Sequence, residues 1–306
     1  MPSAAPGQGY PIRPITLVVT FPPGGAADII ARTLEPVVSA DLGQSVVIEN
    51  RPGVGGNIGI GAVAKAVPDG YTLGIAPGGV LAVAPHLGRA MPFDPEKDLT
   101  PITMLVETPF LLVASRDGPK SVAEVIGVAG ANPEKLSIGH GGNGTSMHLT
   151  AALFIQKAAV RMPLVAYRGT APATNDLLGG HIPLAILDIP GSLPLIQEGK
   201  LKALAISSAK RVPFLPNVPT FAEAGVKDCE AVGWLGLVAA AGTPQEIVIK
   251  LNATFTKAMK DPAITNKLRT LGAEPAPSTP EAFRQFINSE RAKWAKVVAE
   301  AGVKPE

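Results

Sequence analysis

The chain of 306 residues contains one cysteine, Cys229, and can therefore form neither an intramolecular disulfide nor a cysteine-based zinc site. No apolar run is long enough to span a membrane as a helix. Only 17% of the residues are charged, the formal net charge is +2, and Lys and Arg are scattered along the chain. This distribution gives no support to a nucleic-acid-binding surface, so we expect no nucleic acid partner.

What the chain has in abundance is apolar residues, at 46%, enough for buried sheets, and its length suggests two domains. Its 31 prolines and 33 glycines, many at the ends of apolar runs, fit an α/β protein with many short connections. Residues 1–10 contain neither the basic nor the apolar segment of an export signal. They leave two possibilities: a cytoplasmic protein, or a mature chain whose export signal was removed.

Predicted strands and helices alternate over the first hundred residues. The βαβαβ order predicts a parallel sheet that is covered on both faces. The predicted elements are a strand at 15–20, a helix at 25–40, a strand at 45–49, a helix near 58–66 and a strand at 71–76.

Two apolar stretches, at 102–106 and 110–115, lead into a second alternating block and a helical tail. We expect two α/β lobes: lobe one from residues 10–112 and 234–306, and lobe two from residues 113–233. The chain would cross between the lobes near 110–115 and 234–238, and two crossings form a hinge. The tail is predicted to be helical at 244–259, 262–271 and 280–301, to contain no strand, and to pack on lobe one.

The first predicted strand leads into the turn Phe21-Pro22-Pro23-Gly24-Gly25-Ala26-Ala27-Asp28 and then into a helix. Two prolines stiffen this turn, and two glycines expose its backbone. The free N–H groups and the dipole at such a helix start suit an anionic ligand. The turn contains no Lys and no hydroxyl, which excludes a phosphate-binding P-loop. The alternative is that the turn merely connects two elements.

A second strand–turn–helix junction spans residues 139–148, where three glycines match G-x-G-x-x-G. The next predicted strand ends in Arg168 rather than in an acid, so NAD is disfavoured, although Arg168 could meet the 2′-phosphate of NADP. The simpler interpretation is an anion site in which Thr145 and Ser146 supply hydroxyls at a helix N-terminus. Both residues could also act only as helix caps.

The remaining polar residues form no convincing catalytic set. The four histidines lack metal-ligand spacing, and His148 lies on a different helix face from Ser146, so the two are a poor nucleophile–base pair. Asp28 and Asp188 could converge in a cleft, although Asp28 is equally suited to stabilising the start of its helix. We therefore predict no catalytic residues, no metal site and no cofactor. An NADP-dependent oxidoreductase is the competing possibility.

Several motifs, spread from residue 10 to residue 302, occur together in this chain. They are Tyr10-Pro11-Ile12-Arg13-Pro14-Ile15, the turn at 21–28, Glu49-Asn50-Arg51-Pro52-Gly53, Pro68-Asp69-Gly70-Tyr71-Thr72-Leu73, Gly144-Thr145-Ser146-Met147-His148-Leu149, Tyr167-Arg168-Gly169, Gly199-Lys200-Leu201-Lys202-Ala203-Leu204-Ala205 and Pro219-Thr220-Phe221-Ala222-Glu223-Ala224-Gly225. Together they resemble, from end to end, the Bug family, which comprises the substrate-binding proteins of tripartite tricarboxylate transporters.

This resemblance implies a type II periplasmic-binding-protein fold, with two α/β lobes and a ligand cleft between them. It implies export to the periplasm, a small carboxylate ligand and the membrane subunits of a transporter as partners, and we expect a monomer. In the family, the two turns hold the ligand's carboxylate from opposite lobes, partly through ordered water. The roles carry over to Phe21, Pro22, Pro23, Gly24, Gly25 and Ala26 and to Asn143, Thr145 and Ser146, and further candidate ligand-binding residues are Pro77, Gly78, His148, Arg168 and Asp188.

Two departures from the family pattern bear on the ligand. Ala27 stands where members commonly have Thr or Ser, and Ala76-Pro77-Gly78-Gly79 stands where they commonly have hydroxyl residues. Both changes remove hydrogen-bonding groups near the expected pocket. We therefore expect a di- or aromatic carboxylate rather than a heavily hydroxylated ligand such as citrate. An orphan binding protein that signals to a sensor kinase is a further possibility that the sequence leaves open.

Overall fold

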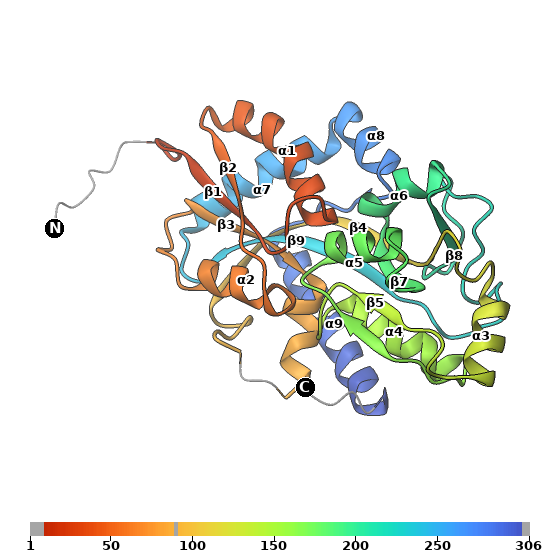
Figure 1. The fold of residues 1–306 in the computed structure, drawn as a ribbon. Helices are drawn as coiled ribbons and strands as arrows, with labels where there is room; N and C mark the ends of the chain where they lie inside the picture. The colour runs from red at the N-terminus through yellow and green to blue at the C-terminus, as the bar shows by residue number, and fades with distance from the viewer. Residues whose placement is uncertain (1–8, 89–90, 302–306) are drawn as a thin grey trace.

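The computed structural model describes residues 9–88 and 91–301, which fold around one long sheet (Figure 1). Strand β1 (Ile15–Val19) lies between β2 (Val46–Asn50) and β3 (Thr72–Pro77), and all three are parallel. Successive β1 side chains point to opposite faces of the sheet. The odd-numbered ones pack with α1 (Ala26–Leu42), whereas Val18 packs with α2 (Asn57–Ala64). The predicted parallel sheet with both faces covered is therefore confirmed.

Two long antiparallel strands extend this parallel unit. Strand β9 (Val232–Ala240) pairs with β3, and β4 (Leu99–Ser115) pairs with β9 over residues 99–109. Over residues 110–115, β4 pairs instead with β7 (Leu184–Asp188) and β8 (Leu201–Ile206). The two apolar stretches seen in the sequence thus form one strand, because the segment between them, which includes Glu107, still pairs with β9.

The strands beyond this switch form the second half of the sheet. We call β1, β2, β3, β9 and β10 (Glu274–Pro275) the first half-sheet and β5 (Ile138–His140), β6 (Leu164–Ala166), β7 and β8 the second half-sheet; β4 runs through both. Within the second, β5 pairs in parallel with β6 and β7. Its elements are α3 (Val122–Ala131), β5 (Ile138–His140), α4 (Ser146–Lys157), β6 (Leu164–Ala166), α5 (Thr170–Leu178), β7 (Leu184–Asp188), α6 (Ile189–Gln197) and β8 (Leu201–Ile206).

The tail packs on the first half-sheet. It consists of α7 (Gln245–Lys260), α8 (Pro262–Thr270), β10 (Glu274–Pro275) and α9 (Pro280–Ala301). Helix α7 packs against α1, where Thr254 donates a hydrogen bond to Asp41 at 2.8 Å. The expectation of a strand-free tail is wrong, because β10 pairs with β4; a two-residue strand is too short to leave a periodic signal.

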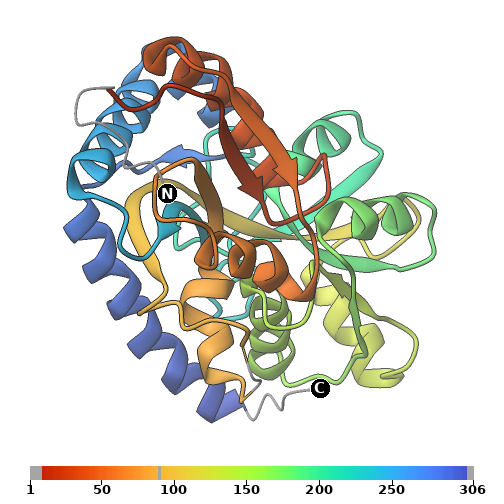
Figure 2. The ribbon, with the colours of Figure 1, turned by 90° about the vertical axis from the view of Figure 1, so that its left-hand side faces the viewer.

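Helix α9 runs beside the helical turn η2 (Gly79–Val83) and along β4 (Figure 2). The Arg291 guanidinium of α9 donates a hydrogen bond to the Leu81 carbonyl at 2.7 Å. The C-terminal helix is thereby fixed to the segment that directly follows β3.

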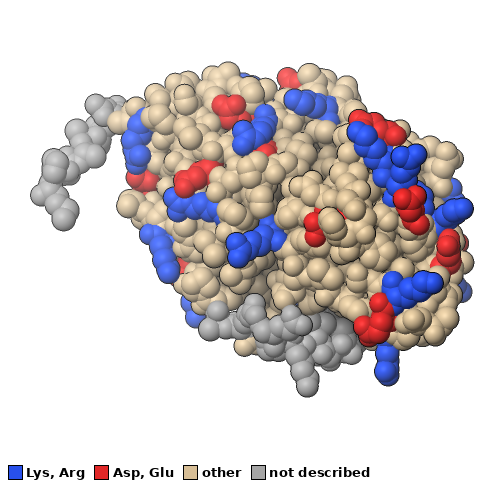
Figure 3. Space-filling view, in the orientation of Figure 1, with Lys and Arg blue, Asp and Glu red and all other residues tan. Residues whose placement is uncertain are grey.

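The hydrophobic core follows the sheet through its whole length. One cluster joins α1, α7 and α8 to one face of the first half-sheet, and another joins α2, η2 and α9 to the opposite face and continues into α3 and α4. A third cluster lies under α5 and α6. On the face shown in Figure 3, basic and acidic side chains are interspersed, with no large region of one sign.

Candidate functional site

The two half-sheets meet around a pocket, which we call the inner pocket. It lies where β1 and β3 lead into their following helical segments and where β4 passes between the half-sheets beside the first residues of β9. The space among its residues, including the opening to solvent, is about 570 Å³. It is lined by Phe21, Ala26, Ala27, Pro77, Gly78, Gly79, Thr108, Phe110, Thr145, Ser146, Met147, Thr170, Asp188, Gly233, Trp234 and Leu235.

A second, outer cavity shares Phe21 with the inner pocket. Its other lining residues come from two glycine-rich loops, one on each half-sheet, and from the end of β6 with the two residues after it. They are Gly53, Val54, Gly55, Gly141, Gly142, Asn143, Ala166, Tyr167 and Arg168. At the contact between the loops, a Cβ added to Gly55 would lie 2.9 Å from the Asn143 carbonyl oxygen, so the two backbones touch across the opening.

The predicted ligand-binding residues divide among three places. Seven line the inner pocket: Phe21, Ala26, Pro77, Gly78, Thr145, Ser146 and Asp188. Asn143 and Arg168 line the outer cavity. Pro22, Pro23, Gly24, Gly25 and His148 line neither, although the first four form the turn that positions Phe21 and Ala26.

Gly25 is the N-cap of α1 and provides no side-chain cap. Of the first N–H groups of this helix, that of Ala26 hydrogen-bonds Asp188. Gly24 before it has φ +85°, a conformation that glycine adopts without strain. A Cβ at Gly25 would lie 3.3 Å from Thr170 Oγ1, which belongs to the second half-sheet. The turn therefore allows a close approach of the two sides of the pocket.

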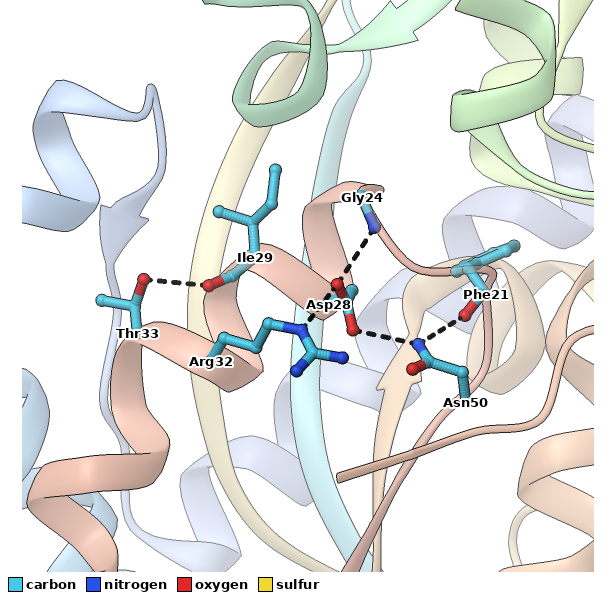
Figure 4. Close-up of polar contacts among 7 residues, drawn as sticks. All are labelled: Phe21, Gly24, Asp28, Ile29, Arg32, Thr33 and Asn50. Atoms are coloured by element: carbon cyan, nitrogen blue, oxygen red, sulfur yellow. Dashed lines mark hydrogen bonds and ion pairs between the residues drawn. The ribbon is translucent and has the colours of Figure 1, made fainter. Parts of the chain in front are cut away.

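Asp28 holds this turn rather than lining the pocket (Figure 4). Its Oδ2 accepts hydrogen bonds from the Gly24 N–H at 3.0 Å and from Arg32 at 2.9 Å, and its Oδ1 accepts one from Asn50 at 3.0 Å. Asn50 also donates to the Phe21 carbonyl at 2.9 Å. Burial alone would raise the pKa of Asp28, but these hydrogen bonds outweigh it and hold the pKa below its usual value. The geometry agrees with a structural role at the helix start.

Thr145 and Ser146 differ in what their hydroxyls do. Thr145 is the N-cap of α4: its hydroxyl accepts from the His148 N–H at 3.2 Å and donates to the Gly142 carbonyl at 2.7 Å. The Ser146 hydroxyl lines the pocket and makes no hydrogen bond within the described part of the chain. Ser146 is therefore free to meet a ligand, whereas Thr145 has a structural bond to lose.

Two stacked histidines support the loop between β5 and α4. The rings of His140 and His148 lie 4.6 Å apart, and each Nδ1 accepts a backbone N–H of the loop, from Gly142 and Gly144 respectively, at 3.3 Å. Burial, with a smaller contribution from His148, lowers the pKa of His140 to about 3, so its ring is neutral at ordinary pH. His148 thus contacts the glycine-rich loop from behind.

Asp188 brings the two half-sheets together at the inner pocket. It caps α6, where its Oδ1 accepts the Gly191 N–H at 3.2 Å, and its Oδ2 accepts the Thr170 hydroxyl. The Ala26 N–H of α1 also hydrogen-bonds it, across the pocket. Burial raises the pKa of Asp188, and these hydrogen bonds offset part of that rise.

The three glycines of residues 139–148 that match G-x-G-x-x-G pack closely against neighbouring side chains. A Cβ at Gly139 would lie 2.5 Å from the Ile182 side chain, and a Cβ at Gly141 would lie 2.5 Å from Met147. A Cβ at Gly144, which has φ +78°, would lie 2.9 Å from the Leu87 side chain. Close packing therefore accounts for these glycines without a nucleotide.

Several pocket residues were not predicted from the sequence. Phe110 and Trp234 lie within the two segments that were predicted to cross between the lobes. This position could have identified them as pocket residues, because a strand that crosses between lobes must pass the cleft. Thr170, at the start of α5, left no such signal.

Within residues 9–88 and 91–301, no three His, Cys, Asp or Glu side chains gather to hold a metal, and no helix is long and apolar enough to cross a membrane.

Comparison with known proteins identifies the family. The model of the family "Tripartite tricarboxylate transporter family receptor" matches residues 30–303. The chain belongs to this family. It is 37% identical to Protein BugT of Bordetella pertussis over 300 residues, covering 96% of this chain and 91% of BugT. The predicted Bug-family membership is confirmed, and the family comprises receptors rather than enzymes.

Solved structures of the family share the fold. "R. palustris Rpa4515 with adipate" superimposes with a TM-score of 0.94 at 39% identity, covering 97% of this chain and 100% of that one. The periplasmic binding protein BugD superimposes with a TM-score of 0.93 at 35% identity, covering 97% of this chain and 100% of BugD. The predicted periplasmic-binding-protein fold is therefore confirmed.

Proposed function

We propose that this receptor captures a small carboxylate in the periplasm and delivers it to the membrane subunits of a tripartite tricarboxylate transporter. The observation that carries the proposal is the inner pocket, where the start of α1, whose N-cap Gly25 has no capping side chain, and the start of α4 converge from opposite half-sheets. Helix starts supply unpaired N–H groups and a positive dipole end, which favour an anion without a basic side chain. The adipate bound by the relative Rpa4515 is such an anion.

In this proposal the ligand's carboxylate lies between Ala26 of α1 and Ser146 of α4. Ser146 contributes its hydroxyl, and the backbone at Pro77 and Gly78 forms the adjoining wall. Asn143 and Arg168, at the outer cavity, would meet a part of the ligand that extends toward solvent. His148 would act through the loop that it supports.

We further propose that residues 10–112 with 234–306 form one lobe and residues 113–233 the other, hinged at β4 and β9. Two observations support this hinge. Strand β4 changes its pairing partners at residue 110, and β9 begins where the connection from the second half-sheet ends. A Cβ added to Gly169 would lie 2.9 Å from the Pro22 side chain across the pocket. Because glycine has no Cβ, the two lobes could close tightly at this point.

A thermal-shift screen tests the proposal. Mono-, di- and aromatic carboxylates are added to the purified protein, with NADP as the comparison for the oxidoreductase alternative. A ligand present at a hundredfold excess over its Kd stabilises the folded state by about 2.7 kcal/mol. We expect such a shift with at least one carboxylate and none with NADP, and Ser146→Ala should reduce it. A shift with NADP but with no carboxylate would refute the proposal.

A further inference from the structure

The ring of Trp234 forms part of the inner-pocket wall and is fixed by several contacts. Its indole N–H donates a hydrogen bond to Glu290 Oε2 on α9 at 3.3 Å. Phe283 and Phe286, also on α9, meet the ring edge-on, with centroid distances of 5.8 and 5.2 Å. A Cβ added to Gly78 would lie 2.6 Å from the indole, so the backbone there lies directly against the ring. The C-terminal helix thus sets the position of a pocket wall.

Glu290 accepts hydrogen bonds from two tryptophans at once. The Trp294 indole N–H donates to the same Oε2 at 3.0 Å, and the Lys293 ammonium lies 3.5 Å from Oε1. The Glu290 side chain is 12% exposed, so the bonds are sheltered from water. Trp294 is buried but does not line the inner pocket. It therefore provides a matched control for Trp234 within the same hydrogen-bond arrangement.

The pocket near Trp234 is apolar and lacks a positive charge. Phe110 and Leu235 flank Trp234, and Phe21 and Met147 add further apolar surface. None of the described lining residues is Lys, Arg or His. The ionisable side chain among them is Asp188, which is 5% exposed.

This composition favours a ligand with one carboxylate. A second carboxylate at the apolar end of the pocket, beside Phe110 and Trp234, would lose its water without gaining a counter-charge. An aromatic body, by contrast, can make edge or offset contacts with Phe110 and Trp234.

We propose that the inner pocket selects an aromatic monocarboxylate, that Trp234 is the residue that determines this specificity, and that Glu290 is its positioning residue. The inference rests on the proposed carboxylate-binding function and narrows it. It separates this chain from Rpa4515, whose structure holds the dicarboxylate adipate.

Calorimetric titration of the full chain with benzoate, adipate and acetate tests the ligand class. We expect benzoate to bind more tightly than the other two. Adipate binding as tightly as benzoate would overturn this inference and leave the proposed function standing. If none of the three bound, this inference would be overturned, and the thermal-shift screen would decide the proposed function.

The chain contains two tryptophans, Trp234 and Trp294, and substituting each in turn tests the role proposed for Trp234. Trp234→Phe should weaken benzoate binding by up to roughly tenfold, the size of an aromatic contact, and change acetate binding little, whereas Trp294→Phe should leave both unchanged. Glu290→Ala should weaken benzoate binding, and Glu290→Gln, which keeps an oxygen acceptor, should restore it.

Fluorescence gives a readout that does not require Trp234 to be changed. In Trp294→Phe, Trp234 is the sole tryptophan, and its emission should change when benzoate saturates the protein. An unchanged emission at saturating benzoate, or an unchanged benzoate affinity in Trp234→Phe, would overturn the assigned role of Trp234.

Discussion

Replacing Gly79 with alanine adds one methyl group where the two sides of the inner pocket touch. The added Cβ would lie 3.0 Å from Thr145 Cα and 3.2 Å from both the Gly144 carbonyl oxygen and the Ser146 nitrogen. Ordinary contacts between such atoms are about 3.5–4.0 Å. All three are backbone atoms, so no side-chain rotation can relieve the contact. The two sides must instead separate by several tenths of an ångström.

The expected cost falls on binding rather than on folding. The methyl group would cover the Ser146 N–H and widen the gap that the carboxylate bridges. Losing one hydrogen bond to a charged group costs about 1.5–3 kcal/mol, which raises Kd by roughly 10- to 150-fold. Gly79 has no positive φ, so alanine introduces no backbone strain there.

Calorimetry on Gly79→Ala measures the change in Kd, and thermal unfolding without ligand checks the fold. The matched control is Gly127→Ala in α3, where an added Cβ meets nothing within 4 Å. The control should bind as the wild type does. Wild-type affinity in Gly79→Ala would show that close approach of the two sides is unnecessary, and the proposed closure would be wrong.

Further predictions concern the two turns. Ser146→Ala should weaken carboxylate binding by about 1.5–3 kcal/mol at unchanged melting temperature, whereas Thr145→Ala should also destabilise the fold by about 1 kcal/mol through the lost cap of α4; equal melting temperatures would contradict this division. Gly25→Val should abolish binding, because its side chain would push against Thr170; a variant that still binds would place the ligand elsewhere. Asp28→Asn should keep much of the affinity but lose stability at pH 7. Because the pKa of Asp28 is lowered on folding, ionised Asp28 adds to the free energy of unfolding above its unfolded pKa of about 4. This added stability is lost as the pH falls through the pKa of the folded state. Urea unfolding should therefore show the difference in stability between the wild type and Asp28→Asn shrinking as the pH falls below about 4, and a constant difference would count against the hydrogen-bonded role.

Local patterns in the sequence predicted most of the elements. Hydrophobic periodicity placed the βαβαβ unit and the tail helices within a few residues of their observed ends. It could not place β10, because two residues carry no period. Periodicity also could not show that β4 is continuous. The strand changes its pairing partners at residue 110, so its residues lie in different surroundings before and after that point.

The site was less predictable because its walls come from distant segments. The turns at residues 21–28 and 143–146 were visible as helix starts. The contact between Trp234 and Glu290 joins residues 56 positions apart, and the Asp28–Asn50 hydrogen bond joins residues 22 apart. Such pairings depend on how the elements pack, which spacing along the sequence does not reveal.

A crystal structure of the full chain with benzoate bound would show directly where the carboxylate and the ring lie. We expect the benzoate carboxylate within hydrogen-bonding distance of the Ser146 hydroxyl and beside the start of α1, directly or through one water, with the ring against Trp234. Benzoate bound in the outer cavity, or outside both cavities, would contradict this expectation.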